Sequence, residues 1–237
     1  MPSFDMLAFD ADDTLWHNER LYNQTQQRFA ELLAQYHPPE WISDRLNQTE
    51  ARNIAHFGYG IKSFGLSMIE TAVELSEGRL TGQDVQALID LIKAMLHAKI
   101  ELLDGVGETI PRLAAHHRLM LITKGDLLDQ EAKIARSGLG SYFQFVEVVS
   151  EKTPAAYERV LGRYQIAPER FLMVGNSLRS DILPVLELGG SAVYIPYETT
   201  WLHESAEAPA AGQPGYYALE NIGQIPALLD RLEQQTG

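Results

Sequence analysis

The sequence contains no cysteine among its 237 residues. Without thiols the chain cannot form disulfides, build a thiolate zinc site or use a cysteine nucleophile. A reducing compartment is compatible with this composition, and we expect a cytoplasmic protein.

Long apolar runs are also lacking. No stretch approaches the roughly 20 apolar residues of a membrane-spanning helix. The first ten residues, MPSFDMLAFD, carry acidic side chains and lack the basic start of a secretory signal. We therefore predict that the protein has no membrane partner.

Positive charge is scarce, because 19 Lys and Arg stand against 32 Asp and Glu, for a formal net charge of −13. Proteins that bind a nucleic-acid backbone rely on many Lys and Arg contacts to phosphates. We predict no nucleic-acid partner, and an anionic substrate would need a local positive site.

The length of the chain and its apolar content of 45% fit one catalytic domain with a modest insertion. We expect a monomer or a homodimer.

Short apolar segments with the length of buried strands recur along the chain. They are Met6–Phe9, Leu119–Ile122, Phe145–Val149, Phe171–Val174 and Ala192–Ile195. Helical stretches lie between the later segments, at Asp129–Arg136, Pro154–Tyr164 and Asp181–Leu188. Strands that alternate with helices predict an α/β fold with a parallel sheet.

About a hundred residues between the first two strands have little strand character. Phe29, Leu32, Leu33 and Tyr36 fall on one face of a helix, which allows this stretch to build its own core. We predict an all-helical domain at residues 17–102, inserted into a catalytic core formed by residues 1–16 and 103–237.

Asp10 and Asp12 follow the first strand directly, at the edge where open parallel sheets bind ligands. The strand period of two places both on one side. Paired carboxylates repel each other unless a cation separates them or one is protonated, as in acid/base pairs and metal sites. The alternative is an Asp-rich turn that only satisfies backbone donors.

Polar residues follow the other strands as well. Thr123 and Lys124 end the second strand, with a hydroxyl and backbone N–H groups suited to phosphate oxygens. Lys152 precedes a helix start, where a compact positive charge could meet the carboxylates. Asn176 and Asp181 follow the fourth strand as oxygen donors for a hard cation. Each has an ordinary alternative: a turn-closing Thr, a solvated Lys or a helix-capping Asn.

The segments FDADDTLW, LITKG, KTP at Lys152 and GNSLRSD occur in the order of the four motifs of the haloacid dehalogenase-like hydrolases, which the chain resembles over nearly its whole length. The resemblance implies a Rossmann-like core with a helical cap inserted after the first motif. It also implies that Asp10 attacks phosphorus to form an aspartyl-phosphate, while Asp12 acts as general acid and base.

The same resemblance assigns ligand-binding roles. Thr123 and Lys152 would bind the transferring phosphoryl group, and we place Lys124 with them as a substrate-binding candidate. Asp10, the backbone carbonyl of Asp12, and Asn176 and Asp181 of the fourth motif would hold Mg²⁺. Asp13 is expected to be structural.

The resembled family includes dehalogenases and phosphomutases, so the reaction has to be inferred from residues. Dehalogenases of this type lack an acid at the position of Asp12, whereas the leaving group of a phosphate ester needs a proton donor. We predict a magnesium-dependent phosphomonoesterase for a small phosphorylated metabolite, either a sugar phosphate or a nucleoside monophosphate. An aspartate is usual where Asn176 stands, so a weakly catalytic regulator that binds a phosphorylated ligand is the competing hypothesis.

Specificity is expected in the inserted domain, within the segment HFGYGIKSF at residues 56–64. It mixes aromatic, glycine and basic residues, as a substrate-contacting loop would. Phe57, Tyr59 and Lys62 are candidates for leaving-group recognition. The alternative is that these side chains only pack between helices.

Overall fold

The computed structural model describes residues 4–198, 206–210 and 212–234. The chain divides into two compact units. We call them the core unit, Met1–Glu19, Ile100–Thr123 and Lys133–Gly237, and the helical unit, Arg20–Lys99 and Lys124–Ala132. The helical unit thus differs from the predicted residues 17–102 in two ways: its first segment is three residues shorter at each end, and it includes a second segment that begins at the last residue of the second strand.

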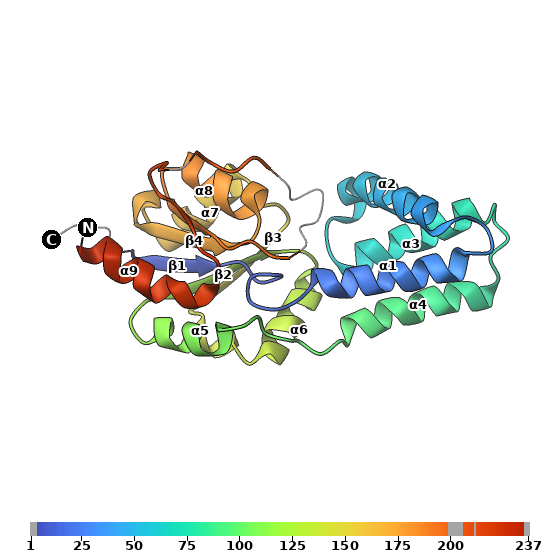
Figure 1. Cartoon of the computed structure of the whole chain (residues 1–237), viewed down its shortest axis with the longest axis horizontal. Helices are drawn as coiled ribbons and strands as arrows, with labels where there is room; N and C mark the ends of the chain where they lie inside the picture. Colours follow the sequence, from blue (N-terminus) through green and yellow to red (C-terminus); the bar gives the residue numbers. More distant parts are fainter. Residues whose placement is uncertain (1–3, 199–205, 211, 235–237) are drawn as a thin grey trace. The chain divides into compact units, whose positions relative to one another are not determined.

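A six-stranded sheet forms the centre of the core unit, in the order β3-β2-β1-β4-β5-β6 (Figure 1). The strands are β1 Met6–Phe9, β2 Leu119–Lys124, β3 Phe145–Val149, β4 Phe171–Gly175, β5 Ser191–Tyr194 and β6 Tyr216–Ala218. The β1–β2, β1–β4, β4–β5 and β5–β6 pairs are parallel. The predicted α/β fold is confirmed. The apolar pattern does not predict β6, because this edge strand has three residues and none is fully buried.

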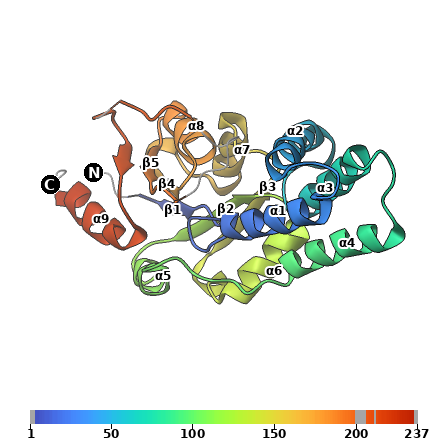
Figure 2. The same ribbon diagram turned by 45° about the vertical axis from the view of Figure 1, so that its right-hand side comes forward.

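Alternate side chains of each central strand enter two different apolar clusters. Leu7 and Phe9 point to one face, and Met6 and Ala8 point to the other. Because helices cover both faces, the strands are apolar throughout (Figures 1 and 2). One face carries α5 Val106–Ala114 and α9 Ile225–Gln234, and the other carries α7 Pro154–Tyr164 and α8 Leu183–Glu187.

Strand register brings the polar ends of three strands to one edge of the sheet. Phe9 pairs with Leu121 of β2 and with Val174 of β4. The next residue, Asp10, donates its backbone N–H to the carbonyl of Val174 at 2.9 Å. The polar residues that follow β1, β2 and β4 are therefore level with one another.

The helix predicted at Asp181–Leu188 is divided into two parts. A π-helical turn, η3 Leu178–Ile182, precedes α8. Pro184 has no N–H to donate to the carbonyl of Ser180, four residues earlier. The hydroxyl of Tyr157 donates to that carbonyl instead, at 3.0 Å. The π-helical turn carries Asp181, so a contact from α7 helps to hold this carboxylate in place.

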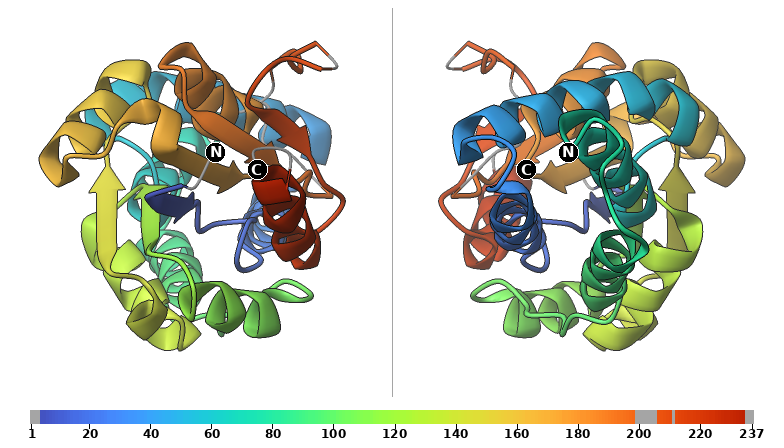
Figure 3. Two further views of the ribbon diagram at one scale, coloured as in Figure 1. Left: turned by 90° about the vertical axis from the view of Figure 1, so that its left-hand side faces the viewer. Right: turned by 90° about the vertical axis from the view of Figure 1, so that its right-hand side faces the viewer.

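The helical unit contains α1 Glu19–Leu33, whose first residue belongs to the core unit, with α2 Pro39–Phe57, α3 Ile61–Leu75 and α4 Gly82–Leu96. Helix α3 packs against both α2 and α4 (Figure 3). Of the predicted apolar face, Phe29 and Leu33 are buried, whereas Leu32 is 40% exposed. Among the described residues, no helix is long and apolar enough to cross a membrane.

Asp126 explains why a segment after β2 belongs with the helical unit. Its carboxylate accepts from the backbone N–H of Asp129 at 3.0 Å, near the start of α6 Leu127–Ser137. The same oxygen lies 2.9 Å from the ammonium of Lys62 on α3. The ammonium of Lys124 also lies 4.3 Å from the ring centroid of Tyr59. Two cationic side chains thus connect residues 124–132 to the α2–α3 region.

Adjacent leucines at the end of α1 offer a matched test of this packing. Replacing buried Leu33 with Ala should lower the free energy of unfolding by about 2 to 5 kcal/mol, because a cavity remains in the core. The same change at half-exposed Leu32 should cost less than about 1 kcal/mol. Urea unfolding of both variants measures the difference. Equal losses would contradict the orientation of α1.

Candidate active site

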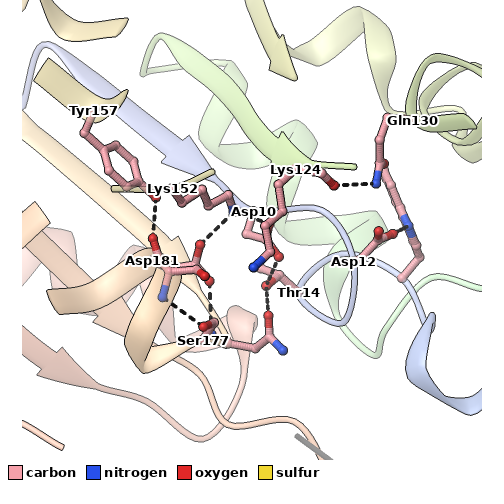
Figure 4. A network of polar contacts seen from close by, with 12 residues as sticks. Asp10, Asp12, Thr14, Lys124, Gln130, Lys152, Tyr157, Ser177 and Asp181 are labelled. Atoms are coloured by element: carbon pink, nitrogen blue, oxygen red, sulfur yellow. Dashed lines mark hydrogen bonds and ion pairs between the residues drawn. The ribbon is translucent and has the colours of Figure 1, made fainter. Parts of the chain in front are cut away.

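Asp10, Lys152 and Asp181 form a buried charged cluster at the carboxyl edge of the sheet (Figure 4). The ammonium of Lys152 donates to Oδ1 of Asp10 and, at 2.7 Å, to Oδ1 of Asp181. Lys152 precedes α7, whose start is capped by Thr153 and carries Pro at its first position. The cap fixes the backbone near the lysine, so its side chain is directed between two carboxylates from different strand ends.

Thr14 connects the cluster to Asn176. Its hydroxyl oxygen lies 3.1 Å from Oδ2 of Asp10 and 3.1 Å from Oδ1 of Asn176. A hydroxyl has one proton and can donate to only one of these oxygens at a time. The oxygen that does not receive this proton keeps a lone pair for another donor or a cation.

Gly175, the last residue of β4, makes room for Asp181. A Cβ atom at this position would lie 2.2 Å from Oδ2 of Asp181. That oxygen also accepts the backbone N–H of Ser177 at 3.0 Å. Only glycine at the strand end therefore allows the carboxylate to pack against the backbone.

Two carboxylates and one ammonium leave this cluster with excess negative charge. Burial raises the pKa of Asp10 to about 7; the charge of Lys152 opposes this shift and the charge of Asp181 adds to it. Burial disfavours the ammonium of Lys152, but the charges of Asp10 and Asp181 outweigh burial and raise its pKa. One further positive charge would compensate the cluster.

The donor set fits a hard divalent cation. The carboxylates of Asp10 and Asp181 and the amide oxygen of Asn176 are oxygen ligands of the kind that Mg²⁺ prefers, and the excess charge favours a cation. Within the described part of the chain, no group of three His, Asp or Glu side chains could hold a metal. A metal here would therefore depend on neutral donors such as Asn176 and a backbone carbonyl.

Asp12 has a different environment from Asp10. The ammonium of Lys133 lies 2.7 Å from each of its carboxylate oxygens, and the indole N–H of Trp16 donates to Oδ1 at 2.7 Å. Figure 4 shows Asp12 set apart from Asp10, Lys152 and Asp181. Sequence reasoning missed Lys133, because a lysine within a polar helical stretch normally faces solvent.

Asp13 has a structural position. It adopts a positive φ of 60°, and its carboxylate accepts the backbone N–H groups of Asn18 and Glu19 at 2.8 and 3.0 Å. These bonds cap the beginning of α1. Burial raises the pKa of Asp13 to about 7, despite the two backbone donors.

The remaining candidates are divided between the units. Thr123 is buried at the end of β2, two residues beyond the partner of Phe9. Lys124 groups with the helical unit, where its ammonium lies over the ring of Tyr59. The core unit thus contains the predicted catalytic, phosphate-binding and metal-binding residues except Lys124, whose substrate-binding role stays a prediction. The candidates for leaving-group recognition, Phe57, Tyr59 and Lys62, lie in the helical unit, and their role also stays a prediction.

Comparisons with known proteins agree with this arrangement. A family model described as haloacid dehalogenase-like hydrolase matches residues 4–189. N-acylneuraminate-9-phosphatase of Mus musculus is 25% identical, over 95% of this chain and 93% of that protein. A solved haloacid dehalogenase-like family hydrolase from Xanthomonas campestris is 40% identical, with a TM-score of 0.87 over 98% of this chain and 93% of that one.

A dehalogenase shares the fold at lower similarity. The 2-haloacid dehalogenase from Pseudomonas syringae has a TM-score of 0.65 and 20% identity, over 97% of this chain and 99% of that one. This likeness concerns the fold alone. The family match covers β1 to β4 and the charged cluster, so the chain belongs to the haloacid dehalogenase-like hydrolases.

Proposed function

We propose that this protein is a magnesium-dependent phosphatase that hydrolyses small sugar phosphates through an aspartyl-phosphate on Asp10. The observation that carries the proposal is the pair of carboxylates after β1 with different environments. Asp10 is buried beside Lys152, whereas the side chain of Asp12 is 22% exposed and has its own set of donors. A nucleophile and a separate acid/base group are what phosphoester hydrolysis through a covalent intermediate requires.

In the first step an oxygen of Asp10 forms a bond to phosphorus, and the bond from phosphorus to the ester oxygen breaks. Asp12 gives a proton to the departing oxygen, which leaves as an alcohol. In the second step Asp12 takes a proton from water, and the resulting hydroxide oxygen attacks phosphorus. The bond to Asp10 breaks, which releases inorganic phosphate and restores the carboxylate.

Lys152 and Thr123 would bind the phosphoryl group during both steps. Lys152 already holds Asp10 in one orientation, and its charge would offset that of the phosphoryl oxygens. The hydroxyl of Thr123 would donate to one of these oxygens. Asp10, the carbonyl of Asp12, Asn176 and Asp181 would hold the metal. When bound, Mg²⁺ reduces the repulsion between carboxylate and phosphate.

Asp12 also favours phosphate transfer over dehalogenation. A halide leaves as a stable anion and needs no proton, whereas an alkoxide leaving group does. The resemblance to a phosphatase from mouse along nearly the full chain supports the same choice, and its name supports a phosphorylated sugar as substrate class. A panel of sugar phosphates and nucleoside monophosphates, assayed with Mg²⁺ for phosphate release, tests the substrate.

Asp10→Asn should reduce turnover by roughly 10,000-fold or more, because an amide is a poor nucleophile and no second route is available. Phosphate release from an aryl phosphate with Mg²⁺ measures this loss. Asp104→Asn, at an exposed position of the core unit, is the matched control and should retain normal turnover. A rate near wild type for Asp10→Asn would exclude Asp10 as nucleophile.

Asp12→Asn should affect poor leaving groups most. Turnover of alkyl phosphates should fall by roughly 100- to 10,000-fold, since their leaving oxygen needs a proton, and activated aryl phosphates should lose less. The measurement is kcat for a series of esters that differ in leaving-group pKa. An equal loss across the series would argue that Asp12 has only a structural role.

Asn176→Asp should lower the Mg²⁺ concentration that gives half-maximal activity, because a carboxylate replaces a neutral ligand. Turnover at saturating metal should change less. Metal activation and substrate KM are measured separately at fixed ionic strength, since the new charge could repel substrate. Unaltered metal activation would show that Asn176 is not a ligand and leave Asp181 as the better candidate.

The neutral side chain of Asn176 motivates a competing hypothesis, in which the protein is a weakly catalytic regulator. Measurement of turnover distinguishes this regulator from the proposed enzyme. A regulator would be stabilised thermally by a phosphorylated ligand without releasing phosphate. Absence of phosphate release with magnesium, manganese or cobalt at any pH would overturn the proposed enzyme.

A further inference from the structure

Lys133 makes a close charged contact with Asp12, although none of the four motifs includes it. Its ammonium contacts both oxygens of Asp12 at 2.7 Å and lies 3.3 Å from the side-chain oxygen of Asn18. The lysine side chain is 7% exposed. It extends from α6, next to Ile134, which belongs to the apolar cluster beneath the sheet.

We propose that Lys133 is a positioning residue that acts through Asp12, by fixing the orientation of the acid/base carboxylate. This inference rests on the proposed function for its catalytic consequence. Lys133 contacts Asp12 and not the reacting atoms. Its role is to hold the carboxylate in one place before the ester oxygen arrives.

The geometry of the donors supports this role. An ammonium has three N–H donors, and its contacts with both oxygens restrain the carboxylate at two points instead of one. The indole N–H of Trp16 adds a third donor from a fully buried ring. Trp16 is itself fixed by backbone bridges to Asp12 and to Leu102. Two side chains from separate parts of the chain, Lys133 and Trp16, therefore define where the carboxylate lies.

Burial requires that the ammonium of Lys133 be paired. A buried ammonium is costly unless it is paired, and a pair that served stability alone could be replaced by apolar side chains. Lys152 already occupies the cluster around Asp10 and Asp181. The core unit thus pairs Asp10 and Asp12 with two different lysines, which keeps the two carboxylates in separate environments.

Kinetics of Lys133→Met in two backgrounds tests the proposal. With Asp12 present, kcat for an alkyl phosphate should fall by roughly 10- to 100-fold with little change in KM, as expected for a misplaced catalytic group. An activated aryl phosphate should lose less. In the Asp12→Asn background, the same substitution should cause no further loss. Equal losses in both backgrounds, or equal losses for both substrates, would overturn the proposal.

Two further variants separate positioning from folding. Lys133→Gln keeps an N–H donor on a side chain that is one atom shorter, and it should give activity between Lys133→Met and wild type. Arg136→Met, at an exposed position of the same helix, should leave activity unchanged. If Lys133→Met does not fold, the neutral double variant Asp12→Asn/Lys133→Met should fold, because no unpaired carboxylate remains. Lys133→Gln at wild-type activity would then count against the role.

A spectroscopic measurement tests the contact even if the protein has no phosphatase activity. The chain has three tryptophans, so nitrogen-15 labelling gives three indole N–H signals, and Trp16→Phe identifies the relevant one. Lys133→Met should shift the Trp16 signal by releasing its acceptor, and Arg136→Met should not. In the Asp12→Asn background, Lys133→Met should cause little shift. An unmoved signal with Asp12 present, or an equal shift in both backgrounds, would overturn the proposal.

Discussion

The core unit is organised around a buried cluster in which negative charges outnumber positive ones. Asp10 and Asp181 share the single ammonium of Lys152 where the strands end. Burying carboxylates in this way is unfavourable unless donors surround them. Several features described above meet this need: the hydroxyl of Thr14, the backbone N–H of Ser177, and the glycine that lets Asp181 approach the strand. The remaining charge makes the same place attractive to a cation and gives the site its chemistry.

Asp10 and Asp12 have different chemical environments in the site. The two residues are two positions apart in the chain, yet their partners come from different parts of the core unit. Lys152 comes from the segment before α7, and Lys133 comes from α6. A nucleophile has to remain aimed at phosphorus, whereas an acid/base group has to exchange protons with other molecules. In the proposed mechanism, separate lysines would allow one short loop to present both functions.

Local patterns were sufficient to predict much of this molecule. Short apolar runs such as Met6–Phe9 predict the central strands, because both faces of the sheet are buried, and polar residues after them predict the site edge. Lys133 could not be found in this way, since its contact with Asp12 spans 121 positions. The π-helical turn could not be predicted from the sequence either, because it involves Pro184 together with a hydroxyl from α7. Such features arise from tertiary packing and have no local signal.

Because Asp126 contacts both α6 and α3, it affects which residues must be exchanged together when the inserted helices are swapped between relatives. This carboxylate accepts a backbone N–H at the start of α6 and pairs with Lys62 of α3. A chimera that replaced only residues 20–99 would remove Lys62 and retain Asp126. The transferable module is therefore discontinuous in sequence, and a graft that respects the physical contacts carries residues 124–132 with the helices.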